Sequence, residues 1–322
     1  MRVKGHCLVW HNQLPKDGLS ELSTEELRIE LRAHIRTVVG RYRGRIAAWD
    51  VVNEALADDG SMRRKTTKAP FSFFERLGPS YIADAFRWAH EADPAATLLY
   101  NDYGVEEVNT KSDAMFSLLH GLLADEVPVH GVGLQGHFKV DQVKVDSVRA
   151  NVARLGALGL SVNLSEVDVR GVHGAAEGLR RQCHVVHELL SACLAEPAFT
   201  GVTFWGVTDR HSWVHKKFGE DDPLLFDRYY QPKPMYHGCA AALAGRDPGA
   251  ESTSPAKVWP TAFSQPATTH WSKVRPPSPR FNAFTCSVST GLHFPVHVPA
   301  SFPSHSCPAP AVGRRGLDRQ HR

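Results

Sequence analysis

The chain has 322 residues, 42% of them hydrophobic, which suits one large domain with an appendage or two ordinary domains. The net charge of +3 is unevenly placed: residues 247–322 carry eight basic and three acidic residues, while the rest nets −2 (29 basic against 31 acidic). A nucleic-acid partner is therefore not indicated, and no run approaches the roughly 18 apolar residues of a membrane helix. The six cysteines form no C-x2-C pair, so a zinc site is not indicated, and a disulfide is left open.

Short apolar runs alternate with helical patterns along residues 1–246. The predicted strands cover residues 3–10, 45–52, 97–101, 129–136, 160–167 and 201–207. The predicted helices follow them at residues 24–39, 79–93, 109–125, 145–158, 175–194 and 234–243, the first opened by a Ser-x-x-Glu capping box at residues 23–26. Strict alternation predicts an α/β fold with a parallel sheet. We expect an α/β barrel, with a doubly wound open sheet as the alternative that the pattern leaves open.

The composition changes near residue 247. Twelve of the 21 prolines and ten serines lie in residues 247–322, which show no helical or strand period. Such a segment cannot bury enough apolar surface to offset its chain entropy. We therefore divide the chain into a catalytic barrel at residues 1–246 and a disordered Pro/Ser-rich tail at 247–322. Trp259 and Trp271 allow a carbohydrate-binding module instead, but the strand alternation that it needs is missing.

Two glutamates stand at the ends of apolar strands. Glu54 ends the segment Trp-Asp-Val-Val-Asn-Glu, and Glu166 ends Val-Asn-Leu-Ser-Glu. The carboxyl ends of the strands form the active-site face of an α/β barrel. Glycoside hydrolysis needs two carboxyl groups beside the scissile bond, one of them able to deliver a proton. Each glutamate alone could equally cap a helix or pair with an arginine, but the two together favour a glycosidase site.

Polar and aromatic side chains gather at the other predicted strand ends. Tryptophan matches the apolar faces of sugars, and amides and imidazoles can bond their hydroxyls. These candidates are His6, Trp10, His11, Gln13, Asn101, Gln135, His137, Trp205 and Trp213. No Gly-rich phosphate loop, dinucleotide fingerprint or G-x-S-x-G elbow follows any strand, which disfavours kinases, Rossmann dehydrogenases and serine hydrolases.

Taken together, these motifs resemble those of glycoside hydrolase family 10, the endo-β-1,4-xylanases. The matching segments are residues 5–15, 49–55, 100–103, 131–137, 165–169 and 204–213, which occur in family order. The resemblance implies an eight-stranded (β/α) TIM barrel, of which the six strands here look like the third to the eighth. It also implies hydrolysis of internal β-1,4-xylosidic bonds of xylan by a retaining mechanism that needs no metal or cofactor.

The resemblance further implies a role for each matching residue. Glu54 would be the acid/base, Asn53 would bond the 2-hydroxyl of the reacting sugar, and Glu166 would be the nucleophile. His137 and Asp168 look like the network that orients Glu166. The residues that look like substrate-binding cleft residues are His6, Trp10, Gln13, Asn101, Gln135, Trp205 and Trp213.

The sequence departs from the family in one respect: the first two strands, with a Glu-Asn pair and a Lys that hold the sugar, have no counterpart here. We therefore expect an N-terminally incomplete barrel with two exposed sheet edges. Two alternatives stay open, an inactive remnant of a xylanase and a related barrel enzyme acting on cellulose or mannan. By family analogy we expect an extracellular monomer acting on xylan or xylo-oligosaccharides, without a nucleic-acid or membrane partner, although no signal peptide is visible.

Overall fold

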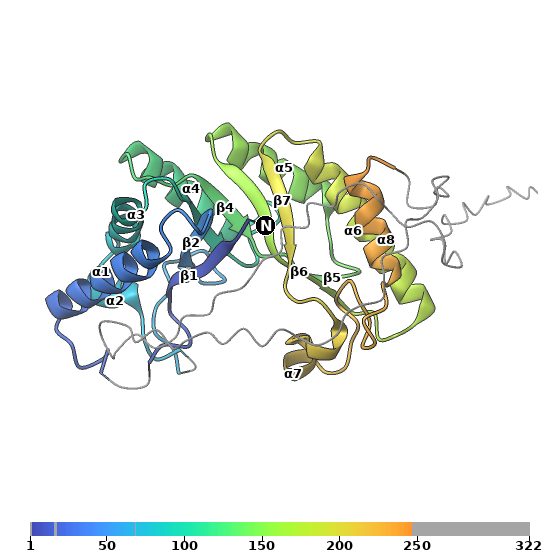
Figure 1. Ribbon diagram of the computed structural model, residues 1–322, viewed down its shortest axis with the longest axis horizontal. Helices are drawn as coiled ribbons and strands as arrows, with labels where there is room; N and C mark the ends of the chain where they lie inside the picture. The colour runs from blue at the N-terminus through green and yellow to red at the C-terminus, as the bar shows by residue number, and fades with distance from the viewer. Residues whose placement is uncertain (1, 16–17, 68, 247–322) are drawn as a thin grey trace, which may run out of the picture.

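The computed structural model describes residues 2–15, 18–67 and 69–246. Its centre is a parallel sheet in which β1, β2, β3, β4, β6 and β7 follow one another in chain order (Figure 1). In an α/β barrel, consecutive strands are added to the sheet in one direction throughout. In a doubly wound sheet, the direction in which strands are added reverses at a switch point. The structure therefore confirms the barrel prediction over the open sheet. Within the described residues, no strand ladder joins β7 to β1.

Figure 1 shows helices α1 to α4 beside the first strands and α5, α6 and α8 beside the last. The strands are β1 Lys4–Trp10, β2 Ala48–Asn53, β3 Thr97–Asp102, β4 Gly131–Leu134, β5 His137–Lys139, β6 Ser161–Arg170 and β7 Phe199–Phe204. The helices are α1 Thr24–Arg41, α2 Phe73–Leu77, α3 Tyr81–Ala92, α4 Thr110–Ala124, α5 Val145–Ala157, α6 Ala176–Leu194, the 3-10 turn Asp209–His211, α7 Val214–Phe218 and α8 Pro234–Leu243.

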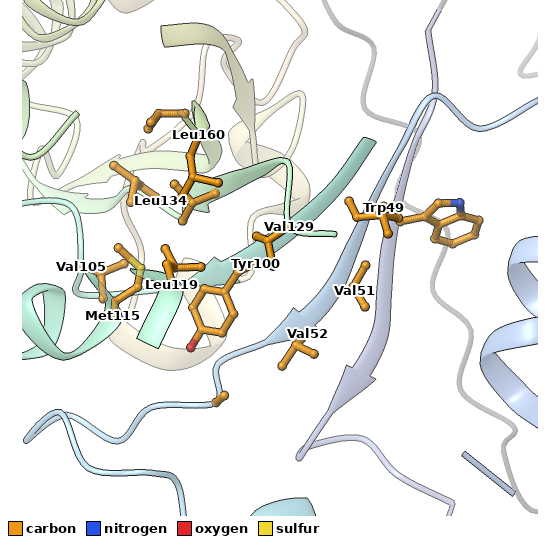
Figure 2. Close-up of a cluster of buried hydrophobic side chains, with 14 of the residues drawn as sticks. Trp49, Val51, Val52, Tyr100, Val105, Met115, Leu119, Val129, Leu134 and Leu160 are labelled. Atoms are coloured by element: carbon orange, nitrogen blue, oxygen red, sulfur yellow. The ribbon is translucent and has the colours of Figure 1, made fainter. Parts of the chain in front are cut away.

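The core lies between the sheet and these helices. Tyr100 of β3 is fully buried and lies beside Met115 and Leu119 of α4 (Figure 2). Trp49 of β2 is also fully buried, and its ring packs 6.4 Å from that of Tyr42, which ends α1. Strands β2, β3 and β4 are buried along almost their whole length, whereas every residue of β7 is at least partly exposed. Strand β7 is therefore an exposed edge of the sheet.

Every predicted strand and helix of residues 1–246 is present, with ends displaced by a few residues. The predicted capping box is formed: Ser23 Oγ accepts the N–H of Glu26, and the Glu26 carboxylate accepts the N–H of Ser23. The predicted strand at 129–136 ends at Leu134, and the three-residue β5 follows as a separate strand beside β6. The predicted tail and its boundary at residue 247 lie outside the described residues.

Candidate active site

The register of the sheet brings one row of side chains to the carboxyl end. Trp10 pairs with Asn53, Asn53 with Asn101, and Asn101 with Gly133. Gly133 is required for this row, because a Cβ there would lie 2.2 Å from Oδ1 of Asn101 and 2.9 Å from Oγ of Ser165. The glycine therefore gives the Asn101 amide room to turn toward the middle of the strand ends.

Both glutamates lie close to this row and accept hydrogen bonds from side chains around it. Glu54 follows β2 directly; its Oε2 accepts from Trp10 Nε1 at 2.9 Å and its Oε1 from Gln135 Nε2 at 3.0 Å. Glu166 lies within β6, only 4% exposed, and its Oε1 accepts from Asn101 Nδ2 at 2.8 Å. Asn101 Nδ2 also lies 2.9 Å from Asn53 Oδ1. The two carboxylates thus belong to one hydrogen-bonded cluster.

Two imidazoles lie beside Glu166. His137 Nε2 is 3.3 Å from Glu166 Oε2, and its Nδ1 is 2.9 Å from Asp168 Oδ2. Burial favours the neutral ring, but the hydrogen bonds and charges of Asp168 and Glu166 outweigh it and raise the pKa of His137 to about 10. Trp213 Nε1 donates to the same Asp168 oxygen at 2.7 Å. Asp168 therefore fixes an imidazolium and an indole at once.

The second imidazole belongs to His6. Its Nδ1 lies 2.9 Å from Asp50 Oδ2 and 3.8 Å from Glu166 Oε1. Burial alone would lower the pKa of His6, but the neighbouring Cys7 and the Asp50 carboxylate raise it well above the ordinary value. Two imidazole rings with raised pKa values therefore lie beside the oxygens of Glu166.

Arg63 supports Glu54 through the main chain. The backbone of Glu54 is left-handed, with φ of 57°, a conformation that costs a non-glycine residue about 1–3 kcal/mol. Arg63 Nε donates to the Glu54 carbonyl at 2.7 Å, and the guanidinium also donates to Leu56 O at 2.5 Å and Tyr103 Oη at 3.2 Å. These bonds hold the carbonyl that follows the unusual φ.

The structure brings together all but one of the predicted site residues. Trp205 joins the cluster through an edge contact with His6, with ring centroids 5.2 Å apart. Gln13 is exposed with φ of 52°, and within the described residues no hydrogen bond links its side chain to either glutamate. The sequence motif therefore identified Gln13 as a candidate, but it did not predict the direction of the Gln13 side chain, which depends on the conformation of its loop.

Sequence reasoning missed several residues that shape the site. Asp50 is fully buried and faces His6, a role that its lone charge in an apolar strand could have signalled. Ser165 donates to Asn101 Oδ1 at 2.6 Å and could have been found as the polar residue before Glu166. Arg63 and Glu106 lie in loops and form hydrogen bonds with backbone groups of other segments. No residue pattern in the sequence predicts such contacts.

Two further properties concern the residues described. No group of three or more His, Cys, Asp or Glu side chains among them is arranged to hold a metal ion. None of their helices combines the length and apolar character needed to cross a bilayer.

Comparison with known proteins decides the family. The model of glycosyl hydrolase family 10 matches residues 1–242. The chain belongs to this family. It is 42% identical over 241 residues to endo-1,4-beta-xylanase B of Thermotoga neapolitana, covering 73% of this chain and 68% of that protein. It is 35% identical over 256 residues to exoglucanase XynX of Acetivibrio thermocellus, covering 74% of this chain but 22% of that larger protein.

Solved structures of family 10 agree with the fold. Native xylanase 10B from Thermotoga maritima superposes with a TM-score of 0.71 at 42% identity, covering 76% of this chain and 75% of that one. Xylanase 10B from Thermotoga petrophila, in complex with xylobiose, gives a TM-score of 0.71 at 41% identity, with 76% and 74% covered. The chain is thus a family 10 glycoside hydrolase with the α/β barrel architecture of that family.

Proposed function

We propose that the chain is an endo-β-1,4-xylanase that cleaves internal xylosidic bonds with retention of anomeric configuration. One observation carries the proposal: Glu54, which directly follows β2, and Glu166, which lies within β6, share one hydrogen-bonded cluster through Asn101, Asn53 and Gln135. A retaining glycosidase needs two such carboxyl groups about 5–5.5 Å apart. The xylanase names of the relatives in this family support xylan as the substrate.

The surroundings of each glutamate support different roles. The two imidazole rings and the Asn101 amide lie beside the Glu166 oxygens and orient that carboxyl group, which supports Glu166 as the nucleophile that attacks the anomeric carbon. Glu54 would carry a proton when substrate arrives and deliver it to the leaving oxygen as that attack proceeds. Glu54 would then remove a proton from a water molecule that releases the sugar from Glu166.

The cluster also supports a role for Asn53. Its Oδ1 accepts from both Asn101 and Gln135, at 2.9 and 3.3 Å, so its amide orientation is set. The side-chain hydrogen bonds of Asn53 in the described part of the chain use Oδ1, and Nδ2 would donate to a hydroxyl of the reacting sugar. A hydrogen bond to the 2-hydroxyl that strengthens in the transition state lowers the barrier to cleavage. Trp205 and Trp213 would offer flat surfaces for the sugar rings.

The test is hydrolysis of xylan by the purified chain, with proton NMR to follow the first anomer released. The β-anomer is expected, and the α-anomer would contradict the double displacement. Glu166→Gln should abolish turnover while the melting temperature stays close to that of the wild type. Wild-type-like rates in this variant would refute the assignment of the nucleophile.

A glucan-cleaving enzyme is the second candidate, because one relative is named an exoglucanase. Hydrolysis of carboxymethylcellulose without hydrolysis of xylan would favour it, whereas hydrolysis of mannan alone would favour a mannan-cleaving enzyme of related fold. An inactive remnant of a xylanase is the third candidate, because the part of the chain that the structure describes has no strand ladder between β7 and β1, and exposed strand edges weaken a barrel. A calorimetric trace without a cooperative transition would support the remnant, and a sharp transition together with turnover would exclude it.

We also propose that the enzyme acts outside the cell as a monomer. The support for location is chemical: a polymeric substrate such as xylan cannot enter a cell. Assay of the culture medium and the cell lysate of the source organism would test this, and activity confined to the lysate would contradict it. Light scattering of the purified chain would test the monomeric state.

A further inference from the structure

One short turn supports both glutamates. Gln135 and His137, the residues on either side of Gly136, reach Glu54 and Glu166 respectively, at 3.0 and 3.3 Å. Gly136 has φ of 80°, the left-handed region that favours glycine. The conformation of this three-residue turn therefore sets two side chains that contact different carboxylates.

On the side that faces β3, the turn is held first by a main-chain acceptor and then by a side-chain acceptor. The N–H of Gln135 donates to Asp102 O at 3.0 Å, the last backbone acceptor that β3 offers to this segment. The next N–H, of Gly136, donates to Oε1 of Glu106 at 2.8 Å. Glu106 is only 8% exposed, and the N–H that it accepts is buried. A buried N–H without an acceptor is unfavourable, so this carboxylate supports the turn in addition to the main-chain bonds that the carbonyls of Gln135 and Gly136 accept from Glu166 and Asp168.

The segment that carries Glu106 is itself fixed. Asn151 of α5 is fully buried, and its Nδ2 donates to the carbonyls of Val105 at 2.7 Å and Glu106 at 3.1 Å. Arg154 Nε donates in turn to Asn151 Oδ1 at 2.7 Å. A chain of buried hydrogen bonds thus runs from helix α5 through Glu106 to the turn.

We propose that Glu106 is a positioning residue that aligns Gln135 and His137, and through them both catalytic glutamates. The inference rests on the proposed function, since it concerns the same pair of carboxylates. Glu106 acts through the Gly136 N–H and contacts neither Glu54 nor Glu166. Loss of the Glu106 carboxylate as acceptor therefore disturbs the positions of both Glu54, the acid/base, and Glu166, the nucleophile.

Three variants separate this role from general stability. Glu106→Ala removes the acceptor, whereas Glu106→Gln keeps an oxygen of similar reach for the Gly136 N–H. Glu107→Ala is the matched control, because the neighbouring Glu107 accepts the Lys144 N–H at 3.1 Å and pairs with Lys144 Nζ at 3.1 Å, away from the turn. Melting curves recorded first establish that each variant is folded.

Activity gives the first readout. Glu106→Ala is expected to lower kcat by about tenfold or more with KM within about threefold, because small displacements of catalytic groups cost rate more than binding. Glu106→Gln and Glu107→Ala should stay within about threefold of wild-type kcat. Equal damage in Glu106→Gln and Glu106→Ala, or an undamaged Glu106→Ala, would overturn the proposal.

The second readout does not depend on turnover. NMR titration of the His137 imidazole should show a lower pKa in Glu106→Ala than in the wild type, because a loosened turn weakens its bonds to Asp168 and Glu166. The pKa of His137 in Glu107→Ala should match that of the wild type. An unchanged titration in Glu106→Ala would overturn the positioning role. A wild type that cleaves no xylan but shows the expected titrations would instead count against the proposed function alone.

Discussion

The Gly133→Ala variant tests the close approach on which the site depends. The added methyl would lie 2.2 Å from Asn101 Oδ1 and 2.9 Å from Ser165 Oγ, well inside van der Waals contact. Both neighbours are buried, so the Asn101 amide must move. Overpacking of this kind costs about 1–3 kcal/mol of the unfolding free energy. Displacement of Asn101 Nδ2 from the Glu166 carboxylate removes a hydrogen bond to a charged group, worth about 1.5–3 kcal/mol.

The expected result is a fall in kcat/KM of about ten- to a hundredfold, obtained by converting the lost hydrogen bond to a barrier height. Urea unfolding measures the stability change, and initial rates on xylan measure the activity. Gly121→Ala is the control, since nothing lies within 4 Å of its added methyl and it stands inside α4, where alanine should stabilise by about 0.5–1 kcal/mol. A Gly133→Ala enzyme with wild-type stability and rate would refute the reasoning.

Two further predictions concern buried charges. Lys111 pairs at 2.8 Å with the fully buried Asp102, whose pKa is raised by burial to about 6 even with that partner, so Lys111→Met should cost about 3–5 kcal/mol by denaturant unfolding. A loss below about 1 kcal/mol would show that the pair behaves like an exposed one. The pKa of His137 is raised to about 10 in the folded state, against about 6.5 unfolded, so its stabilising contribution is complete below pH 6.5 and is lost as pH rises to 10. Thermal melting across this range should show a decline that His137→Asn lacks, and parallel curves for the two proteins would contradict the sign.

The alternation of apolar runs and helical patterns was sufficient to predict a parallel α/β sheet, and the strand order of the structure then decided between the barrel and the doubly wound sheet. Glu54 directly follows β2 as predicted, because it comes after an apolar run. The prediction that Glu166 ends its strand was wrong, since β6 continues to Arg170 and Glu166 lies inside it. The five-residue α2 and the three-residue β5 were not predicted, because neither is long enough to show a helical or strand period of apolar residues. Strand ends shifted by a few residues because pairing with neighbours, rather than local composition, decides where a ladder stops.

The predicted site residues that belong to strands lie together in the structure, whereas several loop residues that contact them were not predicted. Trp10, Asn53 and Asn101 are fixed by register, so a motif on a strand is enough to bring them together. Gln13 lies beyond the strand in a loop with left-handed backbone, where sequence gives no register. Glu106 bonds a main-chain group of a turn 30 residues away, and a contact between a side chain and a distant backbone leaves no signature in composition or period.

Ser165 offers the finest test of how the Asn101 amide is oriented. Its hydroxyl donates to Asn101 Oδ1 at 2.6 Å, which forces Nδ2 toward Glu166. Ser165→Ala would leave Oδ1 buried without that donor and allow the amide to rotate, so that an oxygen faces the carboxylate. We expect kcat/KM to fall about tenfold, with a loss of about 1–3 kcal/mol in unfolding free energy.

Ser161→Ala is the matched control on the same strand, because its hydroxyl donates to the His130 carbonyl at 3.1 Å, at the opposite end of β6. That variant should lose about 0.5–1.5 kcal/mol of stability and no activity. If Ser165→Ala lost stability alone, as the control does, the Asn101 amide would be held by Glu166 itself. In that case the carboxylate of Glu166, and not the hydroxyl of Ser165, would set the orientation of the Asn101 amide.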